Sequence, residues 1–419
     1  MSAVTRHYVL AAGGTGGHLI PAFALATELE QRGHHVALIT DERGAAIPGK
    51  PASLTAHVLP AGRLEGKNPL VWLKGLKAIR EGRAMALRLF ESFDPSAVVG
   101  FGGYPALPAL LAATSANIPT VIHEQNAVLG RVNRFLAGRV DAIATSSGEV
   151  DRLPEKFEDK VTLVGNPVRR EVLDLRDRPY PTFTDDSPFR ILVTGGSQGA
   201  RILSQIMPDG LAMLPAALRA RLQVIQQCRP EDIEQVRERY ASHGIPAELA
   251  TYFEDMAARL ADAHLFVGRA GASTIAELTA VGRPAILLPL PLATDDHQAA
   301  NTREIVAAGG ARMIRQPMVT VHDPDQYGEA KGNQLRSEQS EVIQKLAKDI
   351  SKQIQAMAQH PETLVNAAHA AWNCGYPNAA SDLADLVESF GGTALMDVIR
   401  MGGEARVRSG EALARDRAA

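Results

Sequence analysis

Two segments of this chain share one local design, and that repeat limits what the chain can fold into. The first reads YVLAAGGTGGH over Tyr8–His18, and the second reads ILVTGGSQGAR over Ile191–Arg201. In each segment an apolar strand ends in a glycine-rich turn before a helix. Such a unit opens a Rossmann-like domain, in which ligands bind beyond the carboxyl ends of parallel strands. We therefore expect two such domains that face each other across a cleft.

Short apolar runs alternate with helical stretches, such as Ala22–Arg32, along both halves. Runs that are apolar throughout predict strands buried on both faces of a parallel sheet. The first half offers His7–Ala12, His35–Thr40, Ala97–Phe101, Thr120–His123, Ala142–Ser146 and Val161–Val164. The second half offers Arg190–Thr194, Gln223–Gln227, Ala250–Phe253, Leu265–Val267, Ala285–Leu290 and Ala311–Arg315. The alternation predicts an α/β fold with two doubly wound parallel sheets.

A segment with little apolar pattern separates the two halves. Asp174–Phe189 is rich in Pro, Asp and Arg, which is typical of an interdomain linker. We expect an N-terminal domain over 1–168, a linker over 169–188, a C-terminal domain over 189–360, helices over 361–390 and a frayed tail over 391–419. The polar run Val319–Glu341 predicts a surface insertion, and a helix is expected over Ser340–Met357.

Composition argues against several classes of protein. The 419 residues carry a net charge of −3, whereas nucleic-acid binders usually have a strong basic excess. With Cys228 and Cys374 as the only cysteines, neither a disulfide framework nor a zinc cluster is expected. The first apolar run is too short for a signal peptide. The best candidate for a membrane span, Tyr104–Ile122, contains three prolines and is expected to be a buried helix and loop.

The first glycine-rich turn, Gly13–His18, is suited to bind an anion. Glycines permit close approach of the backbone, and the following helix would present unpaired N–H groups. Diphosphate binding, dinucleotide binding and a tight turn without a ligand are all consistent with it. The dinucleotide fingerprint G-x-G-x-x-G fails because Leu19 occupies the third glycine position. Asp41 nonetheless stands where a dinucleotide enzyme would bind ribose.

Three polar motifs follow apolar strands in the first half. Gly102–Pro105 contains Tyr104, His123–Asn126 reads HEQN, and Gly165–Arg169 ends in an arginine suited to phosphate. Buried polar groups need partners, so such residues face a cleft more often than a core. Each motif also has a plain structural interpretation: a packed tyrosine, a helix cap and an ion pair of the linker.

Three further motifs follow strands in the second half. Gly195–Arg201 places Ser197 among glycines, which suits a phosphate or a sugar. Gly268–Glu277 predicts a helix start whose N–H groups face a phosphate, with Glu277 one turn later and able to bind a ribose. Pro289–Asn301 is dense in polar groups that suit sugar hydroxyls. The structural alternatives are a helix cap, a carboxylate that complements the helix dipole and a solvated loop.

Taken together, these motifs resemble the MurG family of glycosyltransferases. The match runs from about Tyr8 to Phe390 and contains, in order, GGTGGH, GFGGYP, HEQN, GNPVR, GGSQGAR and GASTIAEL. The resemblance implies two Rossmann-like domains in the GT-B arrangement, with the donor mainly on the second and the acceptor on the first. It implies inverting transfer of N-acetylglucosamine from UDP-N-acetylglucosamine (UDP-GlcNAc) to the C4 hydroxyl of the muramyl sugar of lipid I. The product is lipid II, an intermediate of peptidoglycan synthesis on which cell shape and division depend.

The resemblance also implies roles for individual residues. Phe253 looks like the residue whose backbone reads uracil, Glu277 like the ribose ligand and Gln298 like a ligand of a GlcNAc hydroxyl. The other implied donor contacts are Thr15, Gly16, Gly17, Asn126, Arg169, Ser197, Ala272, Ser273, Thr274, Ile275 and Ala276. The implied acceptor-side group, which we take as the candidate catalytic set, is His18, Tyr104, His123 and Glu124. His18 is the first candidate for the general base and Glu124 is the second.

The resemblance implies neither a cofactor nor a metal, because helix N-termini would hold the charge of the departing UDP. Asp295–His297 could form a metal site, but adjacent residues rarely chelate one ion. A lipid acceptor implies an anionic membrane surface, the cytoplasmic face of the bacterial inner membrane, and neighbouring cell-wall enzymes as partners. Gly66–Arg88 suits such a surface because it mixes Trp72 and Leu73 with basic residues, although an ordinary surface helix would look similar.

Three features depart from the family pattern. Val319–Glu341 is longer than expected, Pro291–His297 differs in length from some members, and Gln226–Arg229 replaces a His-Gln-x-Gly type of run. The rival interpretations are a UDP-sugar transferase with another acceptor, an NAD-dependent oxidoreductase, and a non-catalytic nucleotide-binding protein. HEQN and GGYP oppose the first, and Leu19 with the second glycine-rich domain opposes the second. Two facing sets of polar loops oppose the third.

Overall fold

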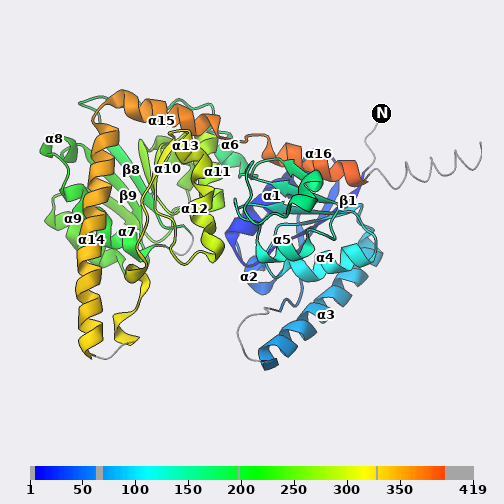
Figure 1. The fold of residues 1–419 in the computed structure, drawn as a ribbon. Helices are drawn as coiled ribbons and strands as arrows, with labels where there is room; N and C mark the ends of the chain where they lie inside the picture. Colours follow the sequence, from blue (N-terminus) through cyan, green and yellow to red (C-terminus); the bar gives the residue numbers. More distant parts are fainter. Residues whose placement is uncertain (1–4, 63–68, 197–198, 327–328, 392–419) are drawn as a thin grey trace, which may run out of the picture.

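The protein consists of two α/β domains that lie side by side (Figure 1). The structure is a computed structural model, and it describes residues 5–62, 69–196, 199–326 and 329–391. Each domain is built around one parallel sheet. The predicted fold class, two doubly wound parallel sheets, is confirmed.

The N-terminal sheet has the strand order β3-β2-β1-β4-β5-β6-β7 within the described residues. Its strands are β1 (His7–Ala11), β2 (His35–Thr40), β3 (Thr55–Val58), β4 (Ala97–Gly100), β5 (Thr120–Glu124), β6 (Ala142–Thr145) and β7 (Val161–Leu163). Its helices are α1 (Gly16–Gln31), α2 (Glu42–Ala45), α3 (Pro69–Phe93), α4 (Ala106–Ser115), α5 (Arg131–Leu136) and the 3₁₀ helix η1 (Glu155–Lys160). The order reverses between β1 and β4, so the turns GGTGGH and GFGGYP meet at the topological switch point, where α/β proteins bind ligands.

The C-terminal sheet repeats this plan with the order β10-β9-β8-β11-β12-β13 within the described residues. Its strands are β8 (Phe189–Thr194), β9 (Leu222–Gln227), β10 (Ala247–Ala250), β11 (Leu265–Gly268), β12 (Ala285–Leu287) and β13 (Ala311–Met313). The helices up to β13 are α6 (Arg170–Leu173), α7 (Arg201–Ala212), α8 (Ala216–Arg219), α9 (Ile233–Ser242), α10 (Met256–Asp262), α11 (Ala272–Val281), η2 (Thr294–Asp296), α12 (His297–Asn301) and α13 (Arg303–Ala307). The switch point lies between β8 and β11. The motifs that begin at Gly195 and Gly268 follow these two strands and therefore meet there.

The strand prediction needs two corrections, one for a strand that was not predicted and one for a strand that was misplaced. β3 has no counterpart among the predicted strands, because its residues are partly exposed at the edge of the sheet and carry no apolar run. The predicted strand Ala250–Phe253 is shifted, since β10 ends at Ala250. Tyr252 is exposed and Phe253 is buried, and both lie in the loop after the strand, so the apolar residues that suggested a strand belong to a loop.

The chain passes between the domains at two adjacent places. One is Gly165, which has a φ of 86°, and the other lies at Tyr376. A Cβ atom at Gly165 would stand 2.2 Å from the Tyr376 Cβ, so the two passages are in contact. The expected linker 169–188 packs on the C-terminal domain, where Phe183 joins the core and the Tyr180 hydroxyl donates to the His264 carbonyl.

The helices that follow β13 divide between the two domains (Figure 1). They are η3 (Met318–Val321), η4 (Pro324–Gln326), α14 (Glu329–Ala358), α15 (Pro361–Asn373) and α16 (Ala379–Gly391). Helix α15 packs on α11 and α14 of the C-terminal domain, whereas α16 returns to the N-terminal domain and packs on α1. Leu383, Ala384 and Val387 of α16 belong to the N-terminal core.

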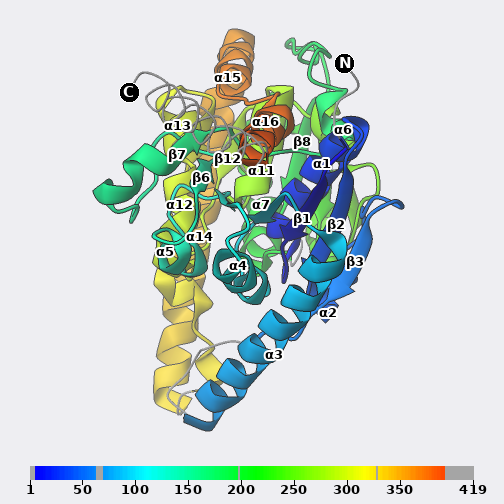
Figure 2. The ribbon, with the colours of Figure 1, turned by 90° about the vertical axis from the view of Figure 1, so that its right-hand side faces the viewer.

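Two helices extend to the same side of the molecule, α3 from the N-terminal domain and α14 from the C-terminal one (Figure 2). The expected surface insertion contains η3, η4 and the first part of α14, so α14 begins well before the predicted Ser340. Its first turns are exposed and polar, and so they lack the apolar period that marks a helix in sequence. Within the described part of the chain, no helix combines the length and apolar character needed to cross a membrane.

Candidate active site

The first glycine-rich turn is held open by close packing and by Asp41. A Cβ atom at Gly13 would lie 2.5 Å from the Pro105 side chain, so only glycine fits there. Asp41 Oδ1 accepts hydrogen bonds from Gly14 N at 3.0 Å and Gly44 N at 2.9 Å. In this structure the Asp41 carboxylate therefore organises the turn, which removes the main feature that favoured a dinucleotide site.

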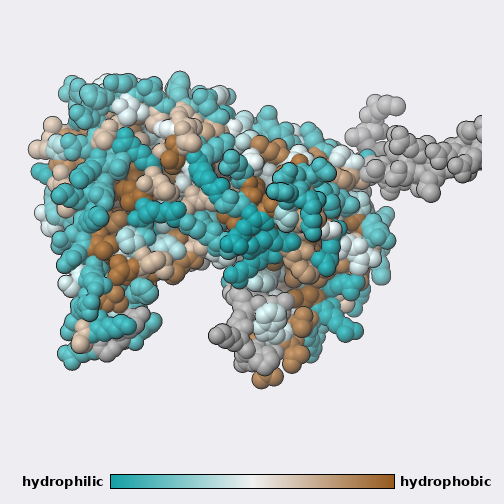
Figure 3. All heavy atoms as spheres, viewed as in Figure 1, coloured by the Kyte–Doolittle hydropathy of each residue, from teal (hydrophilic) through white to brown (hydrophobic). Residues whose placement is uncertain are grey.

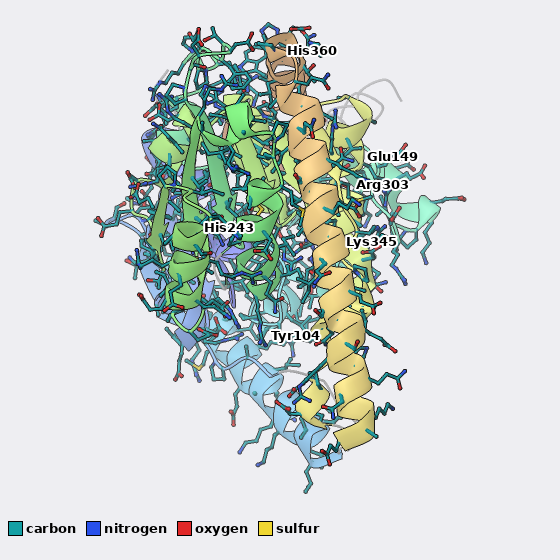
Figure 4. All side chains as sticks on the ribbon, turned by 90° about the vertical axis from the view of Figure 1, so that its left-hand side faces the viewer. Tyr104, Glu149, His243, Arg303, Lys345 and His360 are labelled. Atoms are coloured by element: carbon teal, nitrogen blue, oxygen red, sulfur yellow. The ribbon has the colours of Figure 1, made fainter. Side chains whose placement is uncertain are left out.

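His18 and Tyr104 come together beside this turn. They line a cavity of about 150 Å³ together with Thr15, Asp41 and Arg43. Figure 4 shows Tyr104 toward the side of the molecule to which α3 and α14 project. Thr15 is the N-cap residue of α1 and makes no side-chain capping bond, and Gly16 and Gly17 form the first turn. The free end of α1 thus points at the same space as the candidate base.

His18 is tied to the HEQN motif by a chain of hydrogen bonds. Its Nδ1 lies 2.9 Å from Gln125 Oε1, and Gln125 Nε2 lies 3.0 Å from His123 Nδ1. His123 is fully buried, and its Nε2 lies 2.9 Å from the Gly165 carbonyl oxygen. Burial lowers the pKa of His123 to about 4, so its imidazole is neutral at physiological pH. His123 therefore lies behind His18 and not in the cavity beside it.

Glu124, the second candidate for the base, is buried and has both oxygens occupied. Oε1 accepts from Asn126 N at 3.1 Å and Asn126 Nδ2 at 3.2 Å. Oε2 accepts from Gly130 N and Asn133 Nδ2, both at 2.8 Å. A carboxylate with these bonds fixes the loop that follows β5, and an acceptor hydroxyl would have to displace one of them. The geometry therefore favours His18 over Glu124 as the base.

The start of α11 offers an anion site on the opposite domain. Its N-cap, Gly271, has no side chain to bond the first N–H groups, which belong to Ala272, Ser273 and Thr274. Ser273 Oγ is buried, and no described residue bonds to it. Ile275 and Ala276 complete the turn predicted to contact the donor.

Glu277 lies one turn along α11 and pairs with Arg169. The Arg169 Nη2–Glu277 Oε1 distance is 3.0 Å, and Arg169 Nε donates to the same oxygen at 3.2 Å. Burial raises the pKa of the Glu277 carboxyl, and the Arg169 guanidinium works against that rise. Because both arginine bonds use Oε1, the second oxygen of Glu277 is left to accept from a ligand.

Two further residues that were predicted to contact the donor lie near the carboxyl ends of the C-terminal strands. Phe253 is buried after β10, and the Arg259 guanidinium carbon stands 4.3 Å from the centre of its ring. Gln298 in α12 accepts from Leu290 N at 2.9 Å through its Oε1, which fixes the side chain. Ser197 lies outside the described residues.

The side chains of Asp295, Asp296 and His297, which were considered as a metal site, all bond to other groups of the protein. Asp295 pairs with Arg134 at 2.7 Å, Asp296 pairs with Arg315 at 2.6 Å, and His297 Nδ1 bonds to the Thr294 carbonyl at 2.8 Å. The described residues contain no group of three His, Cys, Asp or Glu side chains placed to hold a metal ion.

The sequence did not predict several contacts between the domains. Asn301 Nδ2 donates to Asn126 Oδ1 at 3.1 Å, and its Oδ1 accepts from Ala127 N at 2.8 Å. Asn301 stands in the polar loop, but its partner could not be read from sequence because the contact spans the domains. Arg303 also crosses, and it lies beside Glu149 at 3.9 Å (Figure 4). These contacts bring the two predicted half-sites together.

Comparisons with known proteins agree with this arrangement. Residues 8–145 match the model of the glycosyltransferase family 28 N-terminal domain, and residues 190–387 match that of the family 28 C-terminal domain. A UDP-GlcNAc 2-epimerase from Neisseria meningitidis, solved with UDP-GlcNAc bound, shares the fold at a TM-score of 0.60 and 16% identity over 91% of this chain and 100% of its own.

Closer relatives carry one shared name. The UDP-N-acetylglucosamine--N-acetylmuramyl-(pentapeptide) pyrophosphoryl-undecaprenol N-acetylglucosamine transferase of Novosphingobium aromaticivorans is 71% identical over 98% of this chain and 99% of its own. Its namesake from Erythrobacter litoralis is 67% identical over the full length of both. The crystal structure of Acinetobacter baumannii MurG has a TM-score of 0.68 at 27% identity, over 92% of this chain and 99% of its own. With these relatives, both domain matches and the two facing half-sites, the chain belongs to the MurG family of glycosyltransferases.

Proposed function

We propose that this chain transfers N-acetylglucosamine from UDP-GlcNAc to the C4 hydroxyl of the muramyl sugar of lipid I, with inversion at the anomeric carbon. The observation that carries the proposal is its 71% identity, over nearly the whole chain, to a protein named for this transfer. The structure supports it through two half-sites, one on each domain.

The donor is proposed to lie against the C-terminal domain. The uncapped start of α11 offers N–H groups and a positive dipole end to the diphosphate. Glu277 has one oxygen free of Arg169, which suits a ribose hydroxyl. As the bond to the sugar breaks, negative charge grows on UDP, and these fixed donors stabilise that charge.

The acceptor is proposed to enter from the N-terminal domain. His18 lines the cavity there, and its Nε2 makes no hydrogen bond to a described residue. It takes the proton of the C4 hydroxyl as that oxygen attacks the anomeric carbon, a step worth roughly 10²–10⁴-fold in rate. Tyr104 lines the same cavity and is proposed to contact the acceptor.

A lipid acceptor requires the enzyme to work at a membrane surface, and α3 is suited to that role. Leu70, Trp72 and Leu73 are 64%, 43% and 62% exposed, and Lys74 and Lys77 follow on the same helix. Figure 3 shows hydrophobic residues gathered at the projecting end of α3. We place the protein on the cytoplasmic face of the bacterial inner membrane, beside other cell-wall enzymes. Residues 66–68 of the predicted segment Gly66–Arg88 lie outside the described residues.

The test is UDP release from UDP-GlcNAc, with and without a short-chain analogue of lipid I. Release that depends on the analogue, together with a disaccharide product, is the expected result. UDP binding without transfer would support the proposed donor site and would show that lipid I is not the acceptor. If His18→Ala kept near-normal turnover, His18 would not be the base.

A further inference from the structure

The chain of hydrogen bonds behind His18 is more than packing, because its geometry fixes where each proton lies. We propose that Gln125 is a positioning residue that holds His18 in the tautomer with its proton on Nδ1 and the lone pair on Nε2. This inference deepens the proposed function, since it rests on His18 as the base of that reaction. Three consecutive links carry it.

The first link starts at Gly165, where a carbonyl oxygen can only accept. His123 Nε2 lies 2.9 Å from that oxygen and must therefore carry a proton. The imidazole of His123 is neutral, because burial lowers its pKa to about 4. A neutral imidazole with a proton on Nε2 has a bare Nδ1, which can only accept.

The second link is the side-chain amide of Gln125, which is buried. Its Nε2 lies 3.0 Å from His123 Nδ1 and 3.0 Å from the His123 carbonyl oxygen, and both of these atoms accept. Turning the amide over would set its oxygen against two acceptors, so the orientation is determined by its neighbours. The Ser146 hydroxyl donates to the Gln125 carbonyl at 2.6 Å and holds the backbone in place.

The third link reaches His18. Gln125 Oε1 can only accept, and His18 Nδ1 lies 2.9 Å from it, so Nδ1 of His18 carries the proton. In neutral His18 the lone pair then lies on Nε2, and no described residue bonds to that atom. Only this tautomer can take a proton through Nε2, whereas the other would present an N–H to the acceptor hydroxyl.

The experiment observes the tautomer directly and then its effect on rate. Full-length protein labelled with ¹⁵N-histidine is studied by NMR above pH 8, where the nitrogen shifts of a neutral imidazole separate the two tautomers. A His18→Gln spectrum identifies the His18 signals. We expect the Nδ1–H form in the wild type and loss of that preference in Gln125→Met, which removes the oxygen acceptor for His18.

Rates are compared in the same proteins. Gln125→Met should lower kcat about 10²-fold, near the lower limit for a positioned base, with little change in the KM for UDP-GlcNAc. In a His18→Ala background the same change should cost nothing further, because the group it positions is absent. Gln316→Met is the matched control, since Gln316 is also a buried glutamine with a side-chain partner, Thr320, and is not one of the predicted site residues.

The outcomes separate cleanly. A proton on Nε2 of His18 in the wild type would overturn the inference, even if Gln125→Met failed to fold. Full additivity of the two changes would also overturn it. If the wild type has the Nδ1–H form but transfers no sugar to the lipid I analogue, the proposed function fails while the hydrogen-bond chain stands.

Discussion

Arg169 and Glu277 meet where the two domains join, with the guanidinium donating twice to one carboxylate oxygen at 3.0 and 3.2 Å. Arg169 directly follows the first passage of the chain between the domains, and Glu277 belongs to α11 of the C-terminal domain. The pair sets the orientation of the free carboxylate oxygen. A change at either residue should therefore affect donor binding.

Glu277→Gln should weaken donor binding without unfolding the protein. The amide keeps the size of the side chain but removes the charge that a ribose hydroxyl bonds to. A hydrogen bond to a charged group contributes roughly 1.5–3 kcal/mol, so the KM for UDP-GlcNAc should rise roughly 10- to 100-fold. Steady-state kinetics measures this, and Glu171→Gln is the control because Glu171 also pairs with Arg169 but is exposed. An unchanged KM would remove Glu277 from the donor site.

Asp295 joins the donor loop to the N-terminal domain. It pairs with Arg134 at 2.7 Å and Arg152 at 3.2 Å, and its φ of 56° is one that few residues other than glycine and asparagine adopt easily. Asp295→Asn keeps that backbone but loses both ion pairs. We expect the KM for UDP-GlcNAc to rise about three- to tenfold, since partly exposed pairs contribute about 1 kcal/mol or less each.

The control for Asp295 is Asp262→Asn, because Asp262 pairs with Arg178 at 2.5 Å without joining the two sheets. Asp262→Asn should leave the KM unchanged. Equal effects of the two substitutions would mean that general surface charge, and not contact between the domains, governs donor binding.

His123 should make the folded protein sensitive to acid. Its folded pKa of about 4 lies below the ordinary value of 6.5. Between these values the unfolded chain binds a proton that the folded chain does not, so stability falls as pH falls from 6.5 toward 4. At 1.36 kcal/mol per pH unit, the loss between pH 6.5 and 5 is about 2 kcal/mol.

Urea unfolding at pH 7.5 and pH 5 measures this loss. His123→Gln can still donate to the Gly165 carbonyl but does not titrate, so the fall in stability should be smaller by that amount in the variant. The same fall in both proteins would assign the acid sensitivity to other groups.

The exposed apolar residues of α3 should hold the protein on anionic membranes. Replacing Trp72 and Leu73 with Ser removes two side chains whose full burial contributes roughly 1.5–3 kcal/mol each. Co-sedimentation with anionic vesicles should weaken at least about tenfold. Met213→Ser serves as the control, because Met213 is 52% exposed on the C-terminal domain. Unchanged binding of the Trp72 and Leu73 variant would exclude α3 from the membrane contact.

Much of the fold could be predicted from sequence because strands buried on both faces leave a continuous apolar run. Edge and surface elements leave weaker signals, so β3 had no counterpart and α14 began earlier than expected. The site residues could be located only as motifs that follow strands. The bonds from Asn301 to Asn126 and from Gln125 to His18 depend on segments far apart in the chain, which spacing alone does not place.

The return of α16 to the N-terminal domain has a consequence for the order of synthesis. Leu383 and Val387 fill part of a core that begins at Tyr8, so the two ends of the described chain complete one hydrophobic layer. Domains generally fold from the N-terminus as they leave the ribosome. Here the apolar surface of the N-terminal domain that α16 covers stays exposed until the C-terminal domain has been synthesised. In a truncated chain that ends before Ala379, this surface would stay exposed to water or to a chaperone.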